Sequence, residues 1–183
     1  MRIIAILGLI TACATTHVPT EQEFLTAHRS SLVVTPKGSG TGFAISETEV
    51  MTAWHVIQSA TSLRVDGRPA SSWKQIGNHD AGIITFEQPH GLTVWKLRNH
   101  DATAAERVYL SGWGVGKHWW SSGIATGDAD RLSCPICPGD SGAPIYDRTG
   151  AVVGIAVSRG RYAEHHCGIV PISRLLPAIK APA

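Results

Sequence analysis

The chain has 183 residues, of which 43% are hydrophobic and 16% are charged, and its formal net charge is +2. This composition is that of a globular protein and excludes a disordered chain, and the length suits one mid-sized domain or two small packed barrels. Lysine and arginine form no cluster, so the composition does not favour a nucleic-acid-binding protein. Glycine and proline are frequent, at 19 and 10 residues, and no long stretch has helical periodicity, which predicts short strands joined by tight turns.

The first residues are typical of a targeting segment. Arg2 supplies a small positive region, and residues 3–10 form an apolar run that is too short to span a bilayer as a mature helix. Ile10-Thr11-Ala12-Cys13 is similar to a bacterial lipobox. We therefore expect residues 1–12 to be removed as a signal peptide and Cys13 to carry a lipid. The alternative is an ordinary secretory signal that is cut after Ala12-Cys13-Ala14.

Both alternatives predict a protein that lies outside the cytoplasm. It is then either a membrane-anchored bacterial lipoprotein or a protein secreted to the periplasm or the exterior, and the compartment is oxidising. Residues 13–30 are polar and mixed, and we expect a tether or a short helix there.

A series of short, β-rich segments follows, each closed by Gly, Pro, Asp or Asn. Residues 101–106 resemble a connection, so we expect an N-terminal half at 31–100 and a C-terminal half at 101–183. Residues 172–180 have the spacing of a short C-terminal helix. The expected strands span residues 31–35, 41–46, 49–53, 62–65, 83–86, 108–112, 122–126, 143–146, 152–157 and 168–171.

Three polar residues in separate segments form the strongest chemical pattern. His55 ends Thr52-Ala53-Trp54-His55, Asp80 precedes an apolar strand, and Ser141 lies in Gly139-Asp140-Ser141-Gly142. Taken alone, the serine motif is weak, since such a sequence is most often a simple turn. A histidine, an aspartate and a serine in this order, each in a suitable local setting, is a much stronger indication. Asp66 and Asp101 compete for the role of the aspartate, but one resembles a turn residue and the other lies in the connection.

These residue types suit acyl transfer. A serine hydroxyl needs a neighbouring base to take its proton as it attacks a carbonyl, and His55 suits that role because imidazole titrates near neutrality. Asp80 would orient the imidazole and stabilise its charged form. The backbone N–H groups of Gly139 and Ser141 would form the oxyanion hole.

The chain resembles the trypsin-like, chymotrypsin-fold serine proteases, in a short bacterial form. Beyond the order of His55, Asp80 and Ser141, the resemblance covers about residues 31–176. Further matching segments are Gly38-Ser39-Gly40-Thr41-Gly42-Phe43, Tyr109-Leu110-Ser111-Gly112-Trp113-Gly114, Val153-Gly154-Ile155-Ala156-Val157 and Gly168-Ile169-Val170.

The resemblance implies an all-β fold of two packed antiparallel barrels with a short C-terminal helix and the site in the cleft between the barrels. It implies a serine endopeptidase that acts on polypeptide substrates through an acyl-enzyme on Ser141 and needs no cofactor or metal. Two alternatives remain open from the residues. One is a protease-fold protein that binds a partner without catalysis, and the other is an esterase-type serine hydrolase.

The aspartate beside the nucleophile departs from the family pattern. In trypsin-type enzymes a freshly cut N-terminus pairs with this aspartate, which is Asp140 here. No activation site is evident before Ser31. We therefore expect a backbone amide or a side chain to satisfy Asp140, and we expect no zymogen step beyond removal of the signal.

For the cysteines, the resemblance implies a Cys137–Cys167 disulfide that holds the specificity pocket. Cys134 would then be free or would compete as the alternative partner. The rival interpretation is a zinc site, because the chain supplies enough ligands for one in Cys134, Cys137, His165, His166 and Cys167.

The substrate pocket is expected around residues 135–138, 157–160 and Cys167. Pro135 stands where trypsins carry an aspartate, so the resemblance does not imply a preference for Lys or Arg. Nearby basic residues either form a rim that favours acidic substrates or are solvated loop charges, and the Trp119-Trp120 loop either edges the cleft or covers the second barrel. The expected substrate-binding residues are Pro135, Pro138, Val157, Ser158 and Arg159, and the basic ones are Arg159, Arg161, His165 and His166.

Overall fold

The computed structural model describes residues 20–126, 130–157 and 167–180. The signal peptide and Cys13 lie outside these ranges and stay predictions, as do the roles given to Ser158, Arg159, Arg161, His165 and His166. Within the described ranges, no helix combines the length and the apolar character that crossing a membrane requires.

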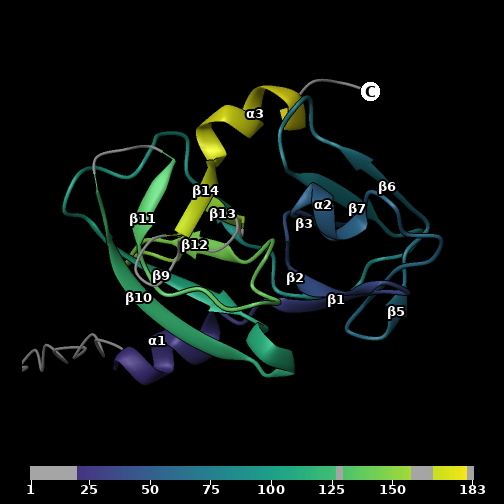
Figure 1. Cartoon of the computed structure of the whole chain (residues 1–183), viewed down its shortest axis with the longest axis horizontal. Coiled ribbons are helices and arrows are strands. Elements are labelled where there is room, and N and C mark those ends of the chain that lie inside the picture. Colours follow the sequence, from purple (N-terminus) through teal and green to yellow (C-terminus); the bar gives the residue numbers. More distant parts are fainter. Residues whose placement is uncertain (1–19, 127–129, 158–166, 181–183) are drawn as a thin grey trace, which may run out of the picture.

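The described strands form two sheets of seven strands each (Figure 1). The first sheet has the order β5-β4-β1-β2-β3-β7-β6, and the second has the order β12-β9-β10-β11-β14-β13-β8. The strands of the first sheet are β1 (Ser31–Thr35), β2 (Gly38–Ala44), β3 (Glu49–Thr52), β4 (Arg64–Val65), β5 (Arg68–Pro69), β6 (Ser72–Gln75) and β7 (Gly82–Thr85). Those of the second are β8 (Lys96–Leu97), β9 (Arg107–Gly112), β10 (Trp119–Ala125), β11 (Arg131–Ser133), β12 (Pro144–Tyr146), β13 (Ala151–Val157) and β14 (Cys167–Pro171).

The two sheets differ in closure. In the second sheet β12 pairs with both β9 and β13, so six antiparallel strands close into a barrel. In the first sheet the pairings among the described residues leave the edge strands β5 and β6 apart, so this sheet is a half-barrel. The expected all-β fold of two packed barrels with a C-terminal helix, α3 (Ile172–Lys180), is confirmed.

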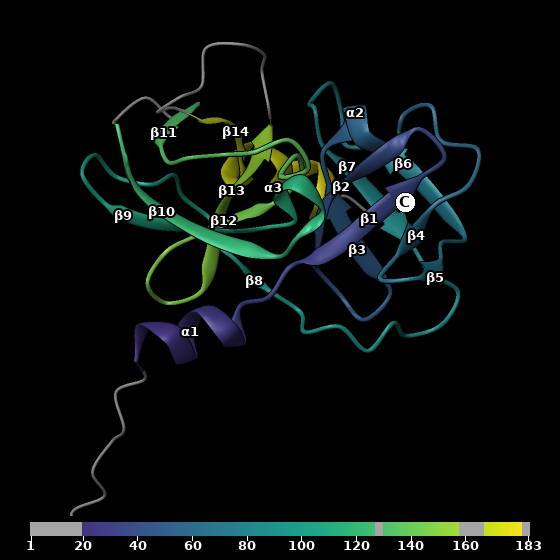
Figure 2. The ribbon, with the colours of Figure 1, turned by 60° about the horizontal axis from the view of Figure 1, so that its bottom comes forward.

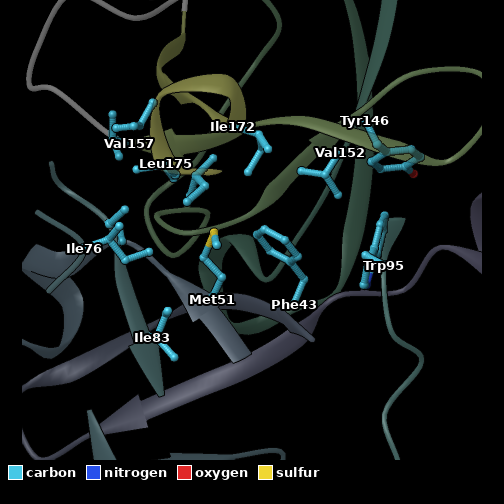
Figure 3. Packing of buried hydrophobic residues seen from close by; sticks show 14 residues of the cluster. Phe43, Met51, Ile76, Ile83, Trp95, Tyr146, Val152, Val157, Ile172 and Leu175 are labelled. Carbon is cyan, nitrogen blue, oxygen red and sulfur yellow. The ribbon is translucent and has the colours of Figure 1, made fainter. Parts of the chain in front are cut away.

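An apolar core joins the two sheets. Phe43 and Met51 from the first sheet lie beside Tyr146 and Val152 from the second, and all four are fully buried. Figure 3 shows these side chains converging between the ribbons, with Leu175 of α3 beside them. Because burying apolar area stabilises a fold by about 25 cal/mol per Å², this common core fixes how one sheet sits on the other, and therefore fixes the site between them.

The segment before β1 contains a docked helix, α1 (Glu21–Ala27). Thr20 and Glu23 form a capping box that satisfies the free amides at its start. Phe24 packs against the rings of Tyr109 and Tyr146, with centroids 5.4 and 5.8 Å away. Figure 2 shows α1 below the second sheet, on the side away from α3. Of the two interpretations of residues 13–30, the structure therefore supports a short helix for its part of this segment.

The observed strands differ from the expected elements in three respects. The short strands β5, β6, β8 and β11 were not expected, and β8 pairs in parallel with β13, so it belongs to the second sheet although it precedes the connection. Trp119 and Trp120 do not lie in a loop but in β10, paired with Ser111 and Gly112 of β9. The pairing of β8 with β13 joins Lys96 to Ala151, far along the chain, and local patterns carry no signal for such a pairing.

A buried cation ties β8 to the second barrel. The Arg98 guanidinium contacts Glu106 Oε1 at 2.5 Å and Asp147 Oδ2 at 3.2 Å, and its side chain is 10% exposed. The hydrogen bond from Arg98 holds the pKa of Glu106 below its usual range. Burial alone would raise the pKa of Asp147, but hydrogen bonds from Thr149, Ala151 and Arg98 hold it below its usual range.

Replacing Arg98 with methionine is expected to lower the free energy of unfolding by about 3 kcal/mol at pH 7, because it leaves two largely buried carboxylates without their cation. A carboxylate whose pKa is depressed by folding stabilises the protein above its unfolded pKa of about 4, and this contribution is lost as the pH falls further. The variant should therefore lose less stability between pH 5 and 2 than the wild type. Urea unfolding at pH 7 measures the loss of stability, and urea unfolding between pH 5 and 2 measures how stability changes with pH. The matched control is Lys96→Met, an exposed residue of β8; equal losses in the two variants would contradict the role given to Arg98.

Candidate active site

His55 and Asp80 meet at one edge of the first sheet. His55 lies in a single-turn helix, α2 (Trp54–Ile57), directly after β3, and Asp80 lies just before β7. The pairing of Thr52 with Gly82 brings the end of β3 beside the start of β7. The sheet register therefore places the two side chains next to each other.

Asp80 holds His55 at two points. Its Oδ2 lies 2.8 Å from His55 Nδ1, and its Oδ1 accepts the His55 backbone N–H at 2.8 Å. A carboxylate at Nδ1 favours the tautomer with the proton on that nitrogen, which leaves Nε2 as the base. The side chains of His55 and Asp80 are 38% and 29% exposed, so the pair remains accessible to solvent.

The competing aspartates have other roles. Asp66 accepts the backbone N–H of Leu32 at 2.8 Å, in the turn between β4 and β5. Asp101 accepts the hydroxyl of Ser173 on α3. Both are therefore engaged in holding backbone or helix in place, away from His55.

Ser141 lies where the two sheets meet. Its carbonyl accepts the backbone N–H of Thr41 in β2 at 2.8 Å. On its other side, Gly142 N–H donates to Ala156 O of β13 at 2.7 Å. The serine backbone is therefore fixed to one strand from each sheet.

Glycines bring the serine loop close to the segment that carries His55. A Cβ on Gly142 would lie 2.3 Å from Thr52 Oγ1 and 2.7 Å from Ala53 N, and a Cβ on Gly40 would lie 2.9 Å from Ser141 O. Only glycine permits these approaches. The hydrogen bonds of the described residues include none between Ser141 Oγ and the His55 ring. This contact often tightens only when substrate is bound.

Gly139, a predicted oxyanion donor, lies in the turn of residues 137–140 before Ser141, which is called the oxyanion turn. Asp140 N–H donates to Cys137 O at 3.0 Å, and Gly139 has a φ of +104°, so residues 137–140 form a type II turn with Pro138 and Gly139 at its centre. Pro138 O accepts Val115 N–H at 2.8 Å. Because the peptide is planar and trans, the Gly139 N–H points away from that carbonyl and is available to an oxyanion.

Thr41 fixes the same turn from the first sheet. Its hydroxyl donates to Gly139 O at 2.8 Å and accepts Trp113 N–H at 2.9 Å. The sequence interpretation missed Thr41 and Val115 as functional residues. The sequence did contain a signal for Thr41. It is the only β-branched residue in the glycine-rich segment Gly38–Phe43, and its side chain carries a hydroxyl that can form hydrogen bonds.

Asp140 is completely buried and has neutral donors as partners. Its carboxylate accepts the Cys137 N–H at 2.6 Å, the Trp119 Nε1–H at 2.8 Å and the backbone N–H of Gly114. Burial raises the pKa of Asp140, and these hydrogen bonds partly offset that. The expectation that a backbone amide or a side chain satisfies Asp140 is confirmed, since both do.

The predicted Cys137–Cys167 disulfide is wrong for this structure. Cys134, Cys137 and Cys167 are free thiols, and Cys167 hydrogen-bonds Cys134. Leu132 pairs with Cys167 across β11 and β14. Cys134 comes two residues later on the same face, whereas Cys137 has already entered the oxyanion turn. Two causes raise the pKa of the Cys134 thiol: first its hydrogen bond with Cys167, and second its burial. A reactive thiolate at Cys134 is therefore unfavourable.

The zinc alternative gains no support in the described part of the chain, where no three His, Cys, Asp or Glu residues gather as metal ligands. The predicted substrate-binding residues fall into two groups. Pro138 lies within the oxyanion turn and Pro135 two residues before it, and both are exposed. Val157 is fully buried in the core between the sheets, so its side chain does not line a substrate pocket, and a substrate contact through its backbone stays a prediction.

The chain is similar to known peptidases. The protein family described as the trypsin-like peptidase domain matches residues 40–155. Protease Do-like 1, chloroplastic, of Arabidopsis thaliana is 27% identical over 150 residues, which are 66% of this chain. The chain spans about a third of the length of that relative, since the match covers 33% of it.

Solved structures share the fold. A serine endoprotease from Yersinia pestis matches with a TM-score of 0.73 at 20% identity, over 90% of this chain and 67% of that one. An inactivated protease paralogue of the scabies mite matches with a TM-score of 0.73 at 15% identity, over 86% of this chain and 92% of that one. Because a protein described as inactivated also matches, the fold alone does not establish catalysis, and the side chains at the site must carry that argument.

Proposed function

The chain belongs to the trypsin-like peptidase family, a family of serine endopeptidases, and from that premise we propose that it hydrolyses peptide bonds through an acyl-enzyme on Ser141. The observation that carries the proposal is the two-point contact of Asp80 with His55, at 2.8 Å for each bond. A structural histidine needs no such contact, whereas a general base needs its tautomer and orientation fixed.

The first half of the reaction forms the acyl-enzyme. Ser141 Oγ attacks the scissile carbonyl carbon while His55 Nε2 takes the hydroxyl proton, and Asp80 stabilises the imidazolium that results. The negative oxygen of the tetrahedral intermediate accepts hydrogen bonds from the N–H groups of Gly139 and Ser141. The intermediate collapses when His55 gives its proton to the leaving amine, which breaks the C–N bond.

The second half releases the acid product. A water molecule attacks the acyl carbon with His55 again taking the proton, and the Ser141 ester bond breaks as the proton returns to Oγ. Apart from this water molecule and the substrate, every group that acts in the two halves is a side chain or a backbone amide of this chain.

A fluorophosphonate probe tests the proposal, because it reacts only with an activated serine. We expect labelling of the wild-type protein to map to the peptide that contains Ser141, and to disappear in Ser141→Ala and in His55→Ala. An absence of labelling in folded protein would overturn the proposal and favour a protease-fold binding protein. Turnover of an ester panel without turnover of a peptide library would instead identify an esterase.

A further inference from the structure

Asp140 carries a buried carboxylate, and the negative charge of this group needs a partner. This aspartate lies between Gly139 and Ser141, whose N–H groups are the proposed oxyanion donors. The whole Asp140 residue is 0% exposed. A buried carboxylate is normally paired with a cation or protonated. In the described part of the chain no cation forms an ion pair with Asp140, and its partners are neutral N–H groups.

We propose that Trp119 is a positioning residue for catalysis, whose indole N–H holds the Asp140 carboxylate in the place of a cation and thereby fixes the oxyanion turn. This inference rests on the proposed function, because it concerns the same site. The contact that carries it is the 2.8 Å hydrogen bond from Trp119 Nε1 to Asp140 Oδ1.

Two glycines leave room for the contact between Trp119 and Asp140. A Cβ on Gly112 would lie 2.2 Å from Asp140 Oδ1, and a Cβ on Gly114 would lie 2.5 Å from Trp119 Nε1. Neither glycine has a positive φ, so neither is required by its backbone conformation. The space that these two glycines leave is therefore occupied by the carboxylate and the indole.

The indole also comes from a rigid element. Trp119 is the first residue of β10 and pairs with Gly112 of β9. The other two donors to Asp140 are the N–H groups of Cys137, which lies outside the helices and strands, and of Gly114, which begins the short 3₁₀ helix η1 (Gly114–Gly116). Trp119 is thus the only donor to Asp140 among the described residues that a barrel strand holds in place.

The expected consequence is specific to the transition state. Without the indole N–H, the carboxylate keeps only donors that lie outside the barrel strands, and the turn can move so that the Gly139 N–H no longer points at the oxyanion. Interactions made only in the transition state affect kcat, whereas KM reports ground-state binding when chemistry is slow. Loss of Trp119 should therefore lower kcat and leave KM nearly unchanged.

The test compares Trp119→Phe with Trp120→Phe in the full chain, on a substrate whose turnover depends on Ser141. Trp120 is the matched control, because its Nε1 is buried without a hydrogen-bond partner among the described residues, so its replacement removes a similar volume and no hydrogen bond. Because a hydrogen bond to a charged group is a strong one, we expect Trp119→Phe to lower kcat by about 10- to 100-fold. KM should change by less than about threefold, and Trp120→Phe should keep kcat within about threefold.

A second variant separates the hydrogen bond from packing. The indole of residue 119 is exchanged for its benzothiophene analogue by suppression of a stop codon, which replaces the N–H by sulfur and keeps the shape of the ring. This analogue should reproduce the loss in kcat even if Trp119→Phe does not fold.

The outcomes are distinct. Full kcat in the folded analogue, or equal losses at positions 119 and 120, would overturn the role of Trp119 while the proposed function stands. A wild-type protein without Ser141-dependent turnover would overturn the proposed function and this inference with it.

Discussion

Replacing Ser141 with alanine is expected to lower kcat/KM on a peptide substrate by about 10⁶-fold, because the variant has no nucleophile and forms no acyl-enzyme. Ser141 lies between β2 and β13 and is only 8% exposed, and its backbone is fixed on both sides. Alanine fits the same backbone, so the fold should persist and the loss should fall on chemistry alone. Initial rates on a peptide library, with thermal unfolding as a check on folding, measure the effect.

The same measurement shows whether Ser141 and His55 act as one unit. His55→Ala should cost nearly as much as Ser141→Ala, and the double variant should be little worse than either. Ser72→Ala is the matched control, since this exposed serine of β6 lies on the far side of β7 from β3, and it should retain full activity. Losses that multiply in the double variant would show that the two residues do not act together.

Replacing Gly139 with alanine is expected to lower kcat by about 10²- to 10³-fold, the cost of one missing oxyanion donor. Gly139 has a φ of +104°, which an alanine rarely adopts, and a Cβ there would lie 2.5 Å from Trp113 O. The turn of residues 137–140 must therefore change shape, and its N–H turns away from the oxyanion. Steady-state kinetics measure the effect, and KM should change much less than kcat.

The control for Gly139→Ala is Gly67→Ala. Gly67 has a φ of +81° in the turn between β4 and β5, and a Cβ there would meet nothing within 4 Å. This variant carries the same kind of backbone strain without the clash and away from the site, so its kcat should stay unchanged. Equal losses in the two variants would mean that strain in the fold, and not the oxyanion donor, is responsible.

Local sequence patterns were sufficient for several elements. The strand at residues 31–35 and the helix at 172–180 have the predicted bounds, because alternation and amphipathic spacing depend only on neighbouring residues. The turn at Pro138-Gly139 is also local, since proline fixes its own φ and glycine supplies the positive one. The pairing of His55 with Asp80 followed from the resemblance, and the 2.8 Å contacts agree with it.

The cysteines and Val157 show where local patterns fail. Sequence distance does not reveal that Leu132 faces Cys167, and this register makes Cys134, not Cys137, the neighbour of Cys167. Val157 ends a strand that is buried on both faces, so its side chain belongs to the core between the sheets. In both cases a contact between distant strands decides the result.

The sequence by itself determined a β-rich chain and the order of His55, Asp80 and Ser141, because strand periodicity, turn chemistry and residue type are properties of short segments. The two-barrel fold and the roles of these residues followed from the family resemblance. Only the tertiary structure decided what holds the oxyanion turn: Thr41 from the first sheet, Val115 from the short 3₁₀ helix η1 and Trp119 from β10. These residues lie between 21 and 98 positions from their partners in the turn. The physical reason is that a buried hydrogen bond forms where two elements pack, and packing is set by the register and closure of the sheets, which no single segment encodes.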